Sequence, residues 1–143
     1  MIPYLILDTG PLVAVFNPND PHHEWAKEQL RNAGAAYITC EAVLTESAYF
    51  LTKSRWGLPL LLDFIDSAPV DIPFDYIQNR DRIRELMMDY ADVPMSFADA
   101  CLVRLSELYP DAPVVTLDSD FLIYRRNRNE QLPVVLPASR KRT

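Results

Sequence analysis

Tyr4-Leu5-Ile6-Leu7-Asp8-Thr9-Gly10-Pro11 is the stretch from which the architecture of this chain can be worked out. Four apolar residues that lead straight into an acid predict a short buried strand, because a parallel strand covered on both faces is continuously apolar. Gly10 and Pro11 end this strand. Asp8 is therefore expected at the carboxyl end of a central strand, where open α/β sheets bind their ligands.

A second stretch near the other end of the chain repeats this pattern. It reads Val114-Val115-Thr116-Leu117-Asp118-Ser119-Asp120-Phe121. Burying a neutral polar group without a partner costs roughly 2–7 kcal/mol, and burying an unpaired charge costs more. We therefore expect something cationic to lie between Asp8 and Asp118.

The composition describes a single folded domain. A chain of 143 residues, 49% apolar and 24% charged, can bury a sizeable core without staples. No apolar stretch is long enough to span a membrane, and no basic segment with an apolar core resembles a secretory signal. Cys40 and Cys101 lie in apolar segments and are interpreted as reduced core residues. Together these features predict a cytoplasmic protein.

The net charge of −6 argues against nucleic-acid binding through an overall positive potential. Basic residues nevertheless gather in three places, each of which taken alone is typical of a solvated face or tail. These clusters are Arg80, Arg82 and Arg84; Arg125, Arg126 and Arg128; and Arg140-Lys141-Arg142 in the tail.

Strands and helices alternate along the chain, which predicts βαβ units and a parallel sheet between helices. The fold class expected is a three-layer αβα sandwich with a mostly parallel sheet of four to five strands. One domain spans residues 1–137, and residues 138–143 form a basic tail. The expected strands are 4–7, 35–39, 70–72, 114–117 and an edge strand at 132–136. The expected helices are 12–16, 22–32, 41–54 with Thr39 as N-cap, 59–65, 75–90, 96–109 and 121–126.

Two further acids occupy helix faces that look apolar. Val43 and Phe50 share a face with Glu46, and the helix around Asp99 has little polar surface. Each acid has a simpler explanation: Asp99 completes a capping box, Asp8 and Asp118 favour turns, and Glu46 pairs with a buried arginine. Four inward carboxylates without a basic neighbour in sequence instead favour a hard divalent cation, Mg²⁺ or Mn²⁺.

Four motifs resemble those of the PIN domain, in an order and spacing similar to small ribonucleases of the VapC toxin type. They are Asp8-Thr9-Gly10-Pro11-Leu12, Leu44-Thr45-Glu46, Ser96-Phe97-Ala98-Asp99-Ala100 and Thr116-Leu117-Asp118-Ser119-Asp120-Phe121. The resemblance implies RNA cleavage that depends on Mg²⁺ or Mn²⁺, a homodimer and an antitoxin partner. It carries over Asp8, Glu46, Asp99 and Asp118 as catalytic metal-site acids, Asp120 as a further metal or water ligand or a helix cap, and Thr9, Ser96 and Thr116 as supporting hydroxyls.

The expected partners are an RNA and an antitoxin. The antitoxin would cover the apolar helical surfaces at Leu12–Phe16 and Leu60–Ile65 and place an arginine or lysine among the acids. The candidate contacts to RNA phosphates are Lys53, Arg80, Arg82, Arg84, Arg125 and Arg126.

Other functions fit the sequence less well. A PIN-like module could bind RNA or a protein without catalysis, but all four acids are present. An RNA-processing nuclease that is not a toxin would carry the same motifs. A haloacid-dehalogenase-like phosphatase would need an acid where Gly10 stands, and a receiver domain would need a lysine at the end of a late apolar strand.

Overall fold

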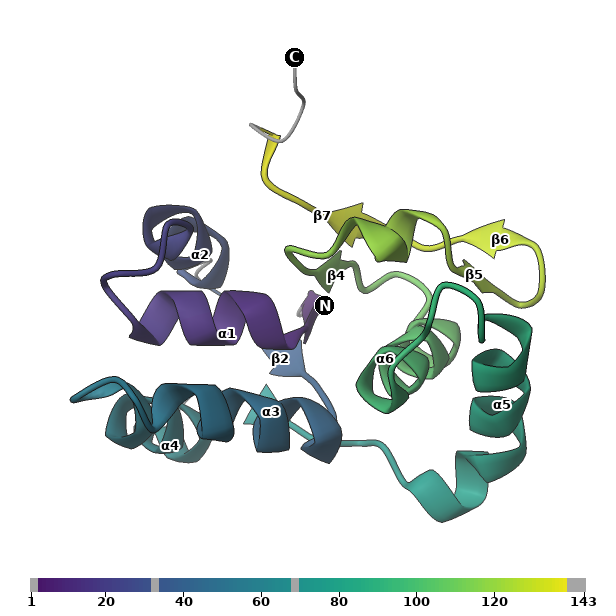
Figure 1. Cartoon of the computed structure of the whole chain (residues 1–143), viewed down its shortest axis with the longest axis horizontal. Helices are drawn as coiled ribbons and strands as arrows, with labels where there is room; N and C mark the ends of the chain where they lie inside the picture. Colours follow the sequence, from purple (N-terminus) through teal and green to yellow (C-terminus); the bar gives the residue numbers. More distant parts are fainter. Residues whose placement is uncertain (1–2, 32–33, 68–69, 139–143) are drawn as a thin grey trace.

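A five-stranded parallel sheet forms the centre of the molecule (Figure 1). The computed structural model describes residues 3–31, 34–67 and 70–138. The strand order is β3-β2-β1-β4-β7, and every neighbouring pair is parallel. The strands are β1 (Tyr4–Leu7), β2 (Ala36–Ile38), β3 (Val70–Asp71), β4 (Val114–Val115) and β7 (Val134–Val135). The edge strand expected at residues 132–136 is confirmed as β7.

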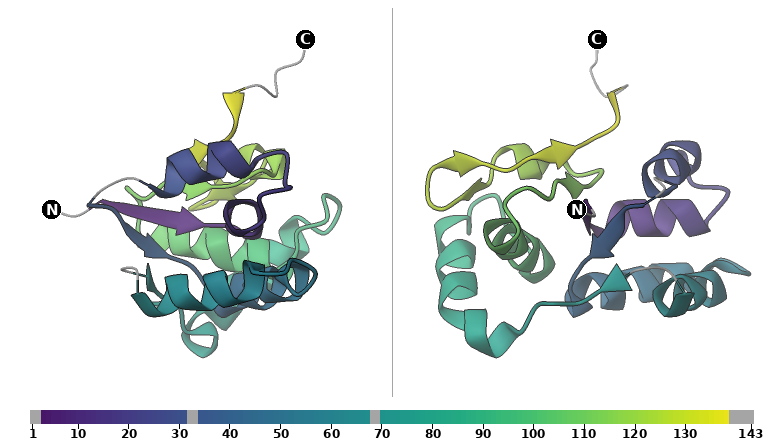
Figure 2. Two further views of the ribbon diagram at one scale, coloured as in Figure 1. Left: turned by 90° about the vertical axis from the view of Figure 1, so that its left-hand side faces the viewer. Right: turned by 180° about the vertical axis from the view of Figure 1, so that it is seen from behind.

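Helices flank this sheet, so the expected αβα arrangement is confirmed (Figure 2). They are α1 (Thr9–Phe16), α2 (His23–Leu30), α3 (Glu41–Leu51), α4 (Gly57–Ser67), α5 (Tyr76–Asp89) and α6 (Phe97–Leu108). A 3₁₀ helix, η1 (Ser119–Leu122), follows β4 and leads into a small antiparallel hairpin of β5 (Arg125–Arg126) and β6 (Glu130–Gln131). No helix in the described ranges is long and apolar enough to cross a bilayer.

The core forms around β1 and α6. Ile6 in β1 pairs with Ile38 of β2 on one side and with Val114 of β4 on the other, and its side chain is fully buried. Helix α6 buries most of its residues and packs against both α5 and the hairpin. A helix that is apolar on nearly all sides belongs inside a protein. Any acid on α6 is therefore held in a fixed position. Both cysteines, Cys40 and Cys101, are free and buried, as expected.

Helix α1 begins earlier than the sequence pattern predicts. The Asp8 side chain accepts a hydrogen bond from the Thr9 amide and caps the helix. Pro11 fits the first turn because an amide there has no partner within the helix. Gly10 lets the helix approach the loop after β4 closely, since a Cβ at this position would lie 3.0 Å from Cδ1 of Leu117.

Two local predictions are wrong. Cys40, not Thr39, precedes α3, and the Thr39 hydroxyl instead donates to the Leu7 carbonyl oxygen at 2.7 Å. The expected helix at 121–126 is replaced by η1 and β5. A guanidinium nitrogen of Arg125 donates to the carbonyl oxygens of Leu122 and Ile123, which would accept from backbone amides if the helix continued. The basic tail lies outside the described residues except for Ala138.

Candidate active site

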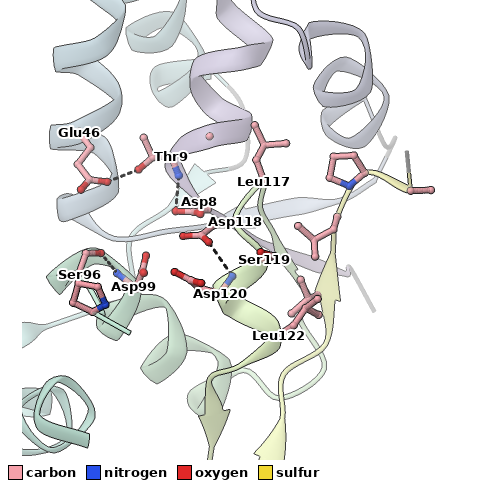
Figure 3. A pocket seen from close by; sticks show the side chains of 16 residues that line it. Asp8, Thr9, Glu46, Ser96, Asp99, Leu117, Asp118, Ser119, Asp120 and Leu122 are labelled. Carbon is pink, nitrogen blue, oxygen red and sulfur yellow. Dashed lines mark hydrogen bonds between the residues drawn. The ribbon is translucent and has the colours of Figure 1, made fainter. Parts of the chain in front are cut away.

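The acids predicted from the sequence line one open pocket at the carboxyl ends of β1 and β4 (Figure 3). The cavity has a volume of about 1230 Å³. Neighbouring parallel strands end at the same edge of a sheet, which brings the loops after β1 and β4 together. The carboxylates that line the pocket are Asp8, Glu46, Asp99, Asp118 and Asp120.

Asp8 is the most buried of these acids, with 7% of its surface exposed. One carboxylate oxygen accepts from the Thr9 amide at 2.7 Å, and the other accepts from the Thr116 hydroxyl at 2.6 Å. Burial raises the pKa of Asp8 from 3.8 to about 6; the charges of Asp99 and Asp118 add to the increase, and the two hydrogen bonds oppose it. Asp8 therefore carries its charge at neutral pH against a substantial desolvation cost.

The Thr116 hydroxyl connects the two halves of the acidic site. It donates to Asp8 and accepts from the Asp118 amide at 2.9 Å. Asp118 in turn caps η1, because one of its carboxylate oxygens accepts from the Asp120 amide at 2.9 Å. This chain of bonds fixes the turn after β4, so that Asp118 and Asp120 face Asp8 across the pocket (Figure 3).

Asp99 reaches the pocket from the first turn of α6. Its amide donates to the Ser96 hydroxyl at 3.0 Å, which forms one half of the expected capping box. The buried Tyr124 hydroxyl donates to one of its carboxylate oxygens at 2.8 Å. Burial raises the pKa of the Asp99 carboxyl, and the nearby charge of Asp118 raises it further. The hydrogen bonds with Tyr124 and Ser96 oppose this increase.

Glu46 is exposed rather than inward-facing, which corrects the expectation from helical periodicity. The buried face of α3 consists of Val43, Ser47 and Leu51 instead. Glu46 lies at the rim of the pocket, where one of its carboxylate oxygens accepts from the Thr9 hydroxyl at 2.7 Å.

The model of the PIN domain matches residues 5–127, which is most of the chain. This chain belongs to the PIN-domain family. Among solved structures it is similar to VapC20 of Mycobacterium tuberculosis, which is described as a sarcin–ricin loop cleaving toxin. The two share 19% identity with a TM-score of 0.72, over 81% of this chain and 91% of that one. No curated protein matches at a significant level.

Within this PIN domain, none of the five pocket acids forms an ion pair with a lysine or arginine of the described ranges. The same ranges also contain no ready-made cage of three or more His, Cys, Asp and Glu side chains for one ion. The donors nevertheless fit Mg²⁺ or Mn²⁺, because these ions prefer carboxylate oxygens and Mg²⁺ keeps several waters rather than filling a protein cage. Asp8 supports this fit, since it is a buried carboxylate without a lysine or arginine partner in the part of the chain that the structure describes.

Three of the arginines expected to contact RNA have structural roles in this PIN domain. Arg126 is 6% exposed, and its guanidinium donates to the Ser106 and Pro110 carbonyl oxygens and to Glu130. Arg82 is bound to Glu107 and Glu85. The third, Arg125, donates to the carbonyl oxygens of Leu122 and Ile123 at the end of η1. These side chains are already occupied, so the prediction that they bind phosphate is not supported. Lys53, Arg80 and Arg84 are exposed and stay predictions.

The sequence interpretation of this PIN domain missed Tyr124. A buried tyrosine needs a partner for its hydroxyl, and this rule would have indicated that an acid or carbonyl lay nearby. Nothing in the spacing, however, connects position 124 with Asp99 on a different element. The interpretation also missed the apolar side of the pocket, formed in part by Leu117, Leu122 and Leu136.

Proposed function

We propose that this protein is an endoribonuclease that depends on Mg²⁺ or Mn²⁺. The single observation that carries the proposal is the convergence of five carboxylates on one open pocket without a lysine or arginine partner among the described residues. Membership of the PIN-domain family supports it. So does the description of the similar VapC20 as a toxin that cleaves the sarcin–ricin loop.

The residues would divide the work according to their positions. Asp8 at the end of β1 and Asp99 at the start of α6 would hold the cation together with Asp118 and Asp120 from the loop after β4. When bound, the metal supplies Lewis acidity toward the phosphodiester and lowers the pKa of a coordinated water. Thr116 and Tyr124 orient Asp8 and Asp99 through their hydrogen bonds. Without a cation the same carboxylates would repel the phosphodiester.

The test is cleavage of single-stranded and structured RNA by purified protein. Cleavage is expected with Mn²⁺ or Mg²⁺, to disappear in EDTA and to be lost in Asp99→Asn. Asp111→Asn is the matched control, because Asp111 is exposed and precedes β4, at the opposite end of that strand. Full cleavage in EDTA by nuclease-free protein would refute the metal-dependent mechanism. Metal and RNA binding without cleavage would favour the non-catalytic module.

We further propose that the protein acts in the cytoplasm as the toxin of a toxin–antitoxin pair. The surfaces first expected to bind the antitoxin are partly covered by the protein itself. Leu12 and Leu61 are buried, and the rings of Phe16 and Phe64 pack against each other with their centroids 5.5 Å apart. Exposed apolar side chains remain on α3, on α4 and in the turn between them: Tyr49, Phe50, Trp56, Leu60 and Leu62. These side chains are the revised candidates for the antitoxin contact.

The toxin assignment is tested by expression in the native host. Growth arrest by the wild type, its absence in Asp99→Asn and recovery of a small partner protein are expected. Harmless expression without any partner would favour an RNA-processing nuclease instead. The homodimer is a separate proposal, which sedimentation equilibrium of the purified protein tests.

A further inference from the structure

The pocket has two chemically different sides. The five carboxylates form one side, and aliphatic side chains form the other (Figure 3). The members of this aliphatic wall are Leu117, Leu122, Val134, Leu136 and Pro137. They come from the loop after β4, from η1 and from the edge strand β7 and the residues after it.

Leu122 is the most exposed residue of the aliphatic wall, at 55%, whereas the other members are half-buried or buried. Its neighbour in η1, Phe121, is fully buried, so consecutive apolar residues of one short helix face the core and the pocket respectively. Core packing therefore explains Phe121 but not Leu122. The Arg125 guanidinium donates to the Leu122 carbonyl oxygen at 2.9 Å and so stabilises the backbone that carries this side chain.

The size of the pocket exceeds what the acids and a phosphate need. At about 1230 Å³ it is larger than the ~300–1,000 Å³ of typical small-molecule sites. RNA has the same division of polarity: an anionic phosphate is joined through one ribose to a base whose flat face is largely apolar. A phosphodiester bound at the carboxylates would bring an adjacent base to the aliphatic wall.

We propose that the aliphatic wall binds the nucleobase next to the scissile phosphate, with Leu122 as its main contact. This inference rests on the proposed ribonuclease activity. A base can enter such a site only when it is unstacked, which selects single-stranded or loop RNA over continuous duplex. Aliphatic side chains contact the face that all four bases share. Cleavage therefore depends on the presence of this base more than on its identity.

The test uses oligoribonucleotides with a single abasic position, moved one nucleotide at a time across the cleaved bond. Stacking of a base on an aromatic side chain in single-strand sites is worth roughly 5- to 150-fold in binding, and for an aliphatic contact we expect the lower part of this range, about tenfold. Removal of the base on one side of the cut should lower kcat/KM of the wild type by about that factor. Leu122→Ala should lose about tenfold on intact RNA and show no further loss on the abasic RNA. Leu122→Met should keep the wild-type pattern.

Leu108→Ala is the matched control, because Leu108 is also exposed, at 42%, but lies at the far end of α6 from Asp99. It should behave like the wild type on every substrate. If the wild type cleaves intact and abasic RNA equally, or if Leu122→Ala retains the abasic loss, the base site is overturned while the nuclease stands. If Leu122→Ala binds the antitoxin more weakly and still shows the wild-type loss on abasic RNA, Leu122 contacts the protein partner and the base site is overturned. If the wild type cleaves no RNA at all, the proposed function itself has failed.

Discussion

Asp8 combines three constraints in one side chain. It caps α1, accepts the Thr116 hydroxyl and faces Asp99 and Asp118 in the pocket. The first two interactions stabilise its charged form, yet burial and the neighbouring charges outweigh them, so its pKa is raised to about 6. A group that is costly to ionise in the folded protein lowers stability wherever it is ionised.

This imbalance predicts an unusual pH dependence for the metal-free protein. Between about pH 4 and 6 the folded state holds a proton on Asp8 that the unfolded state has lost, so the free energy of unfolding should fall as pH rises through this window. The full effect is at most about 3 kcal/mol. Asp8→Asn should lose the Asp8 part of this fall and keep only the contribution of Asp99, whose pKa is also raised, and it should be at least as stable as the wild type at pH 7.

Urea unfolding in EDTA at pH 4.5, 5.5 and 7 measures this difference. The control, Asp111→Asn, should retain the wild-type slope. An Asp8→Asn protein that is much less stable than the wild type at pH 7 would mean that the capping role of Asp8 dominates over the cost of its charge.

Tyr124 offers a second test at the same scale, because it touches Asp99 through a single hydroxyl. Tyr124→Phe keeps the ring contacts with Phe121 and Tyr90 but removes the donor to Asp99. Loss of a partner of this kind typically lowers metal affinity or activity by about 10–100-fold. Calorimetric titration with Mn²⁺ should show this loss, whereas Tyr109→Phe should bind as the wild type does. Equal affinity of Tyr124→Phe and the wild type would remove Tyr124 from the site.

At the scale of elements, one buried acid joins α5, α6 and the hairpin turn. The Glu107 side chain is 2% exposed and accepts from Arg82, Arg104 and the Asn127 amide. Burial alone would raise the pKa of Glu107, but these bonds outweigh it and lower the pKa below 4.5. Glu107 therefore stabilises the protein above about pH 4.5, and this contribution is lost as pH falls through its lowered pKa, opposite in sign to Asp8.

Replacement of Glu107 by Gln should destabilise the protein by about 2–3 kcal/mol at pH 7. The value lies below the ~3–5 kcal/mol typical of fully buried pairs because Arg82 and Arg104 remain partly exposed. Urea unfolding measures it, and Glu85→Gln is the matched control, since Glu85 is 38% exposed and should cost less than about 1 kcal/mol. A loss in Glu107→Gln no larger than in the control would show that the hairpin does not depend on this acid.

The elements also show what the sequence could and could not predict. Continuous apolar runs such as Leu5–Leu7 predicted the central strands, because burial on both faces leaves a clear pattern. Helical periodicity placed Glu46 on the wrong face, because Tyr49 and Phe50 are themselves exposed. The helix predicted at 121–126 was wrong because the chain leaves η1 for β5. The Arg125 side chain binds the carbonyl oxygens at the end of η1, and such a contact leaves no periodic pattern in the sequence. Tyr124 was missed because its partner lies 25 residues away.

At the scale of the whole molecule, the sheet creates the site by placing two neighbouring strand ends beside α6. The order β1-β4 brings together acids separated by more than a hundred residues, and the carboxylates of the pocket face one another (Figure 3). Their repulsion opposes folding, and a divalent cation that binds only the folded state should offset it. The stability of this protein should therefore depend on metal.

Thermal unfolding with and without Mn²⁺, for the wild type and for Asp8→Asn and Asp99→Asn, tests this account most directly. At about 100 times its dissociation constant, Mn²⁺ should stabilise the wild type by about 2.7 kcal/mol, or on the order of 10 °C in Tm. Both variants should melt in EDTA at or above the wild-type Tm and should gain much less from Mn²⁺. If Mn²⁺ leaves the wild-type Tm unchanged, the acids do not form a metal site. If both variants melt far below the wild type in EDTA, the acids hold the fold together instead.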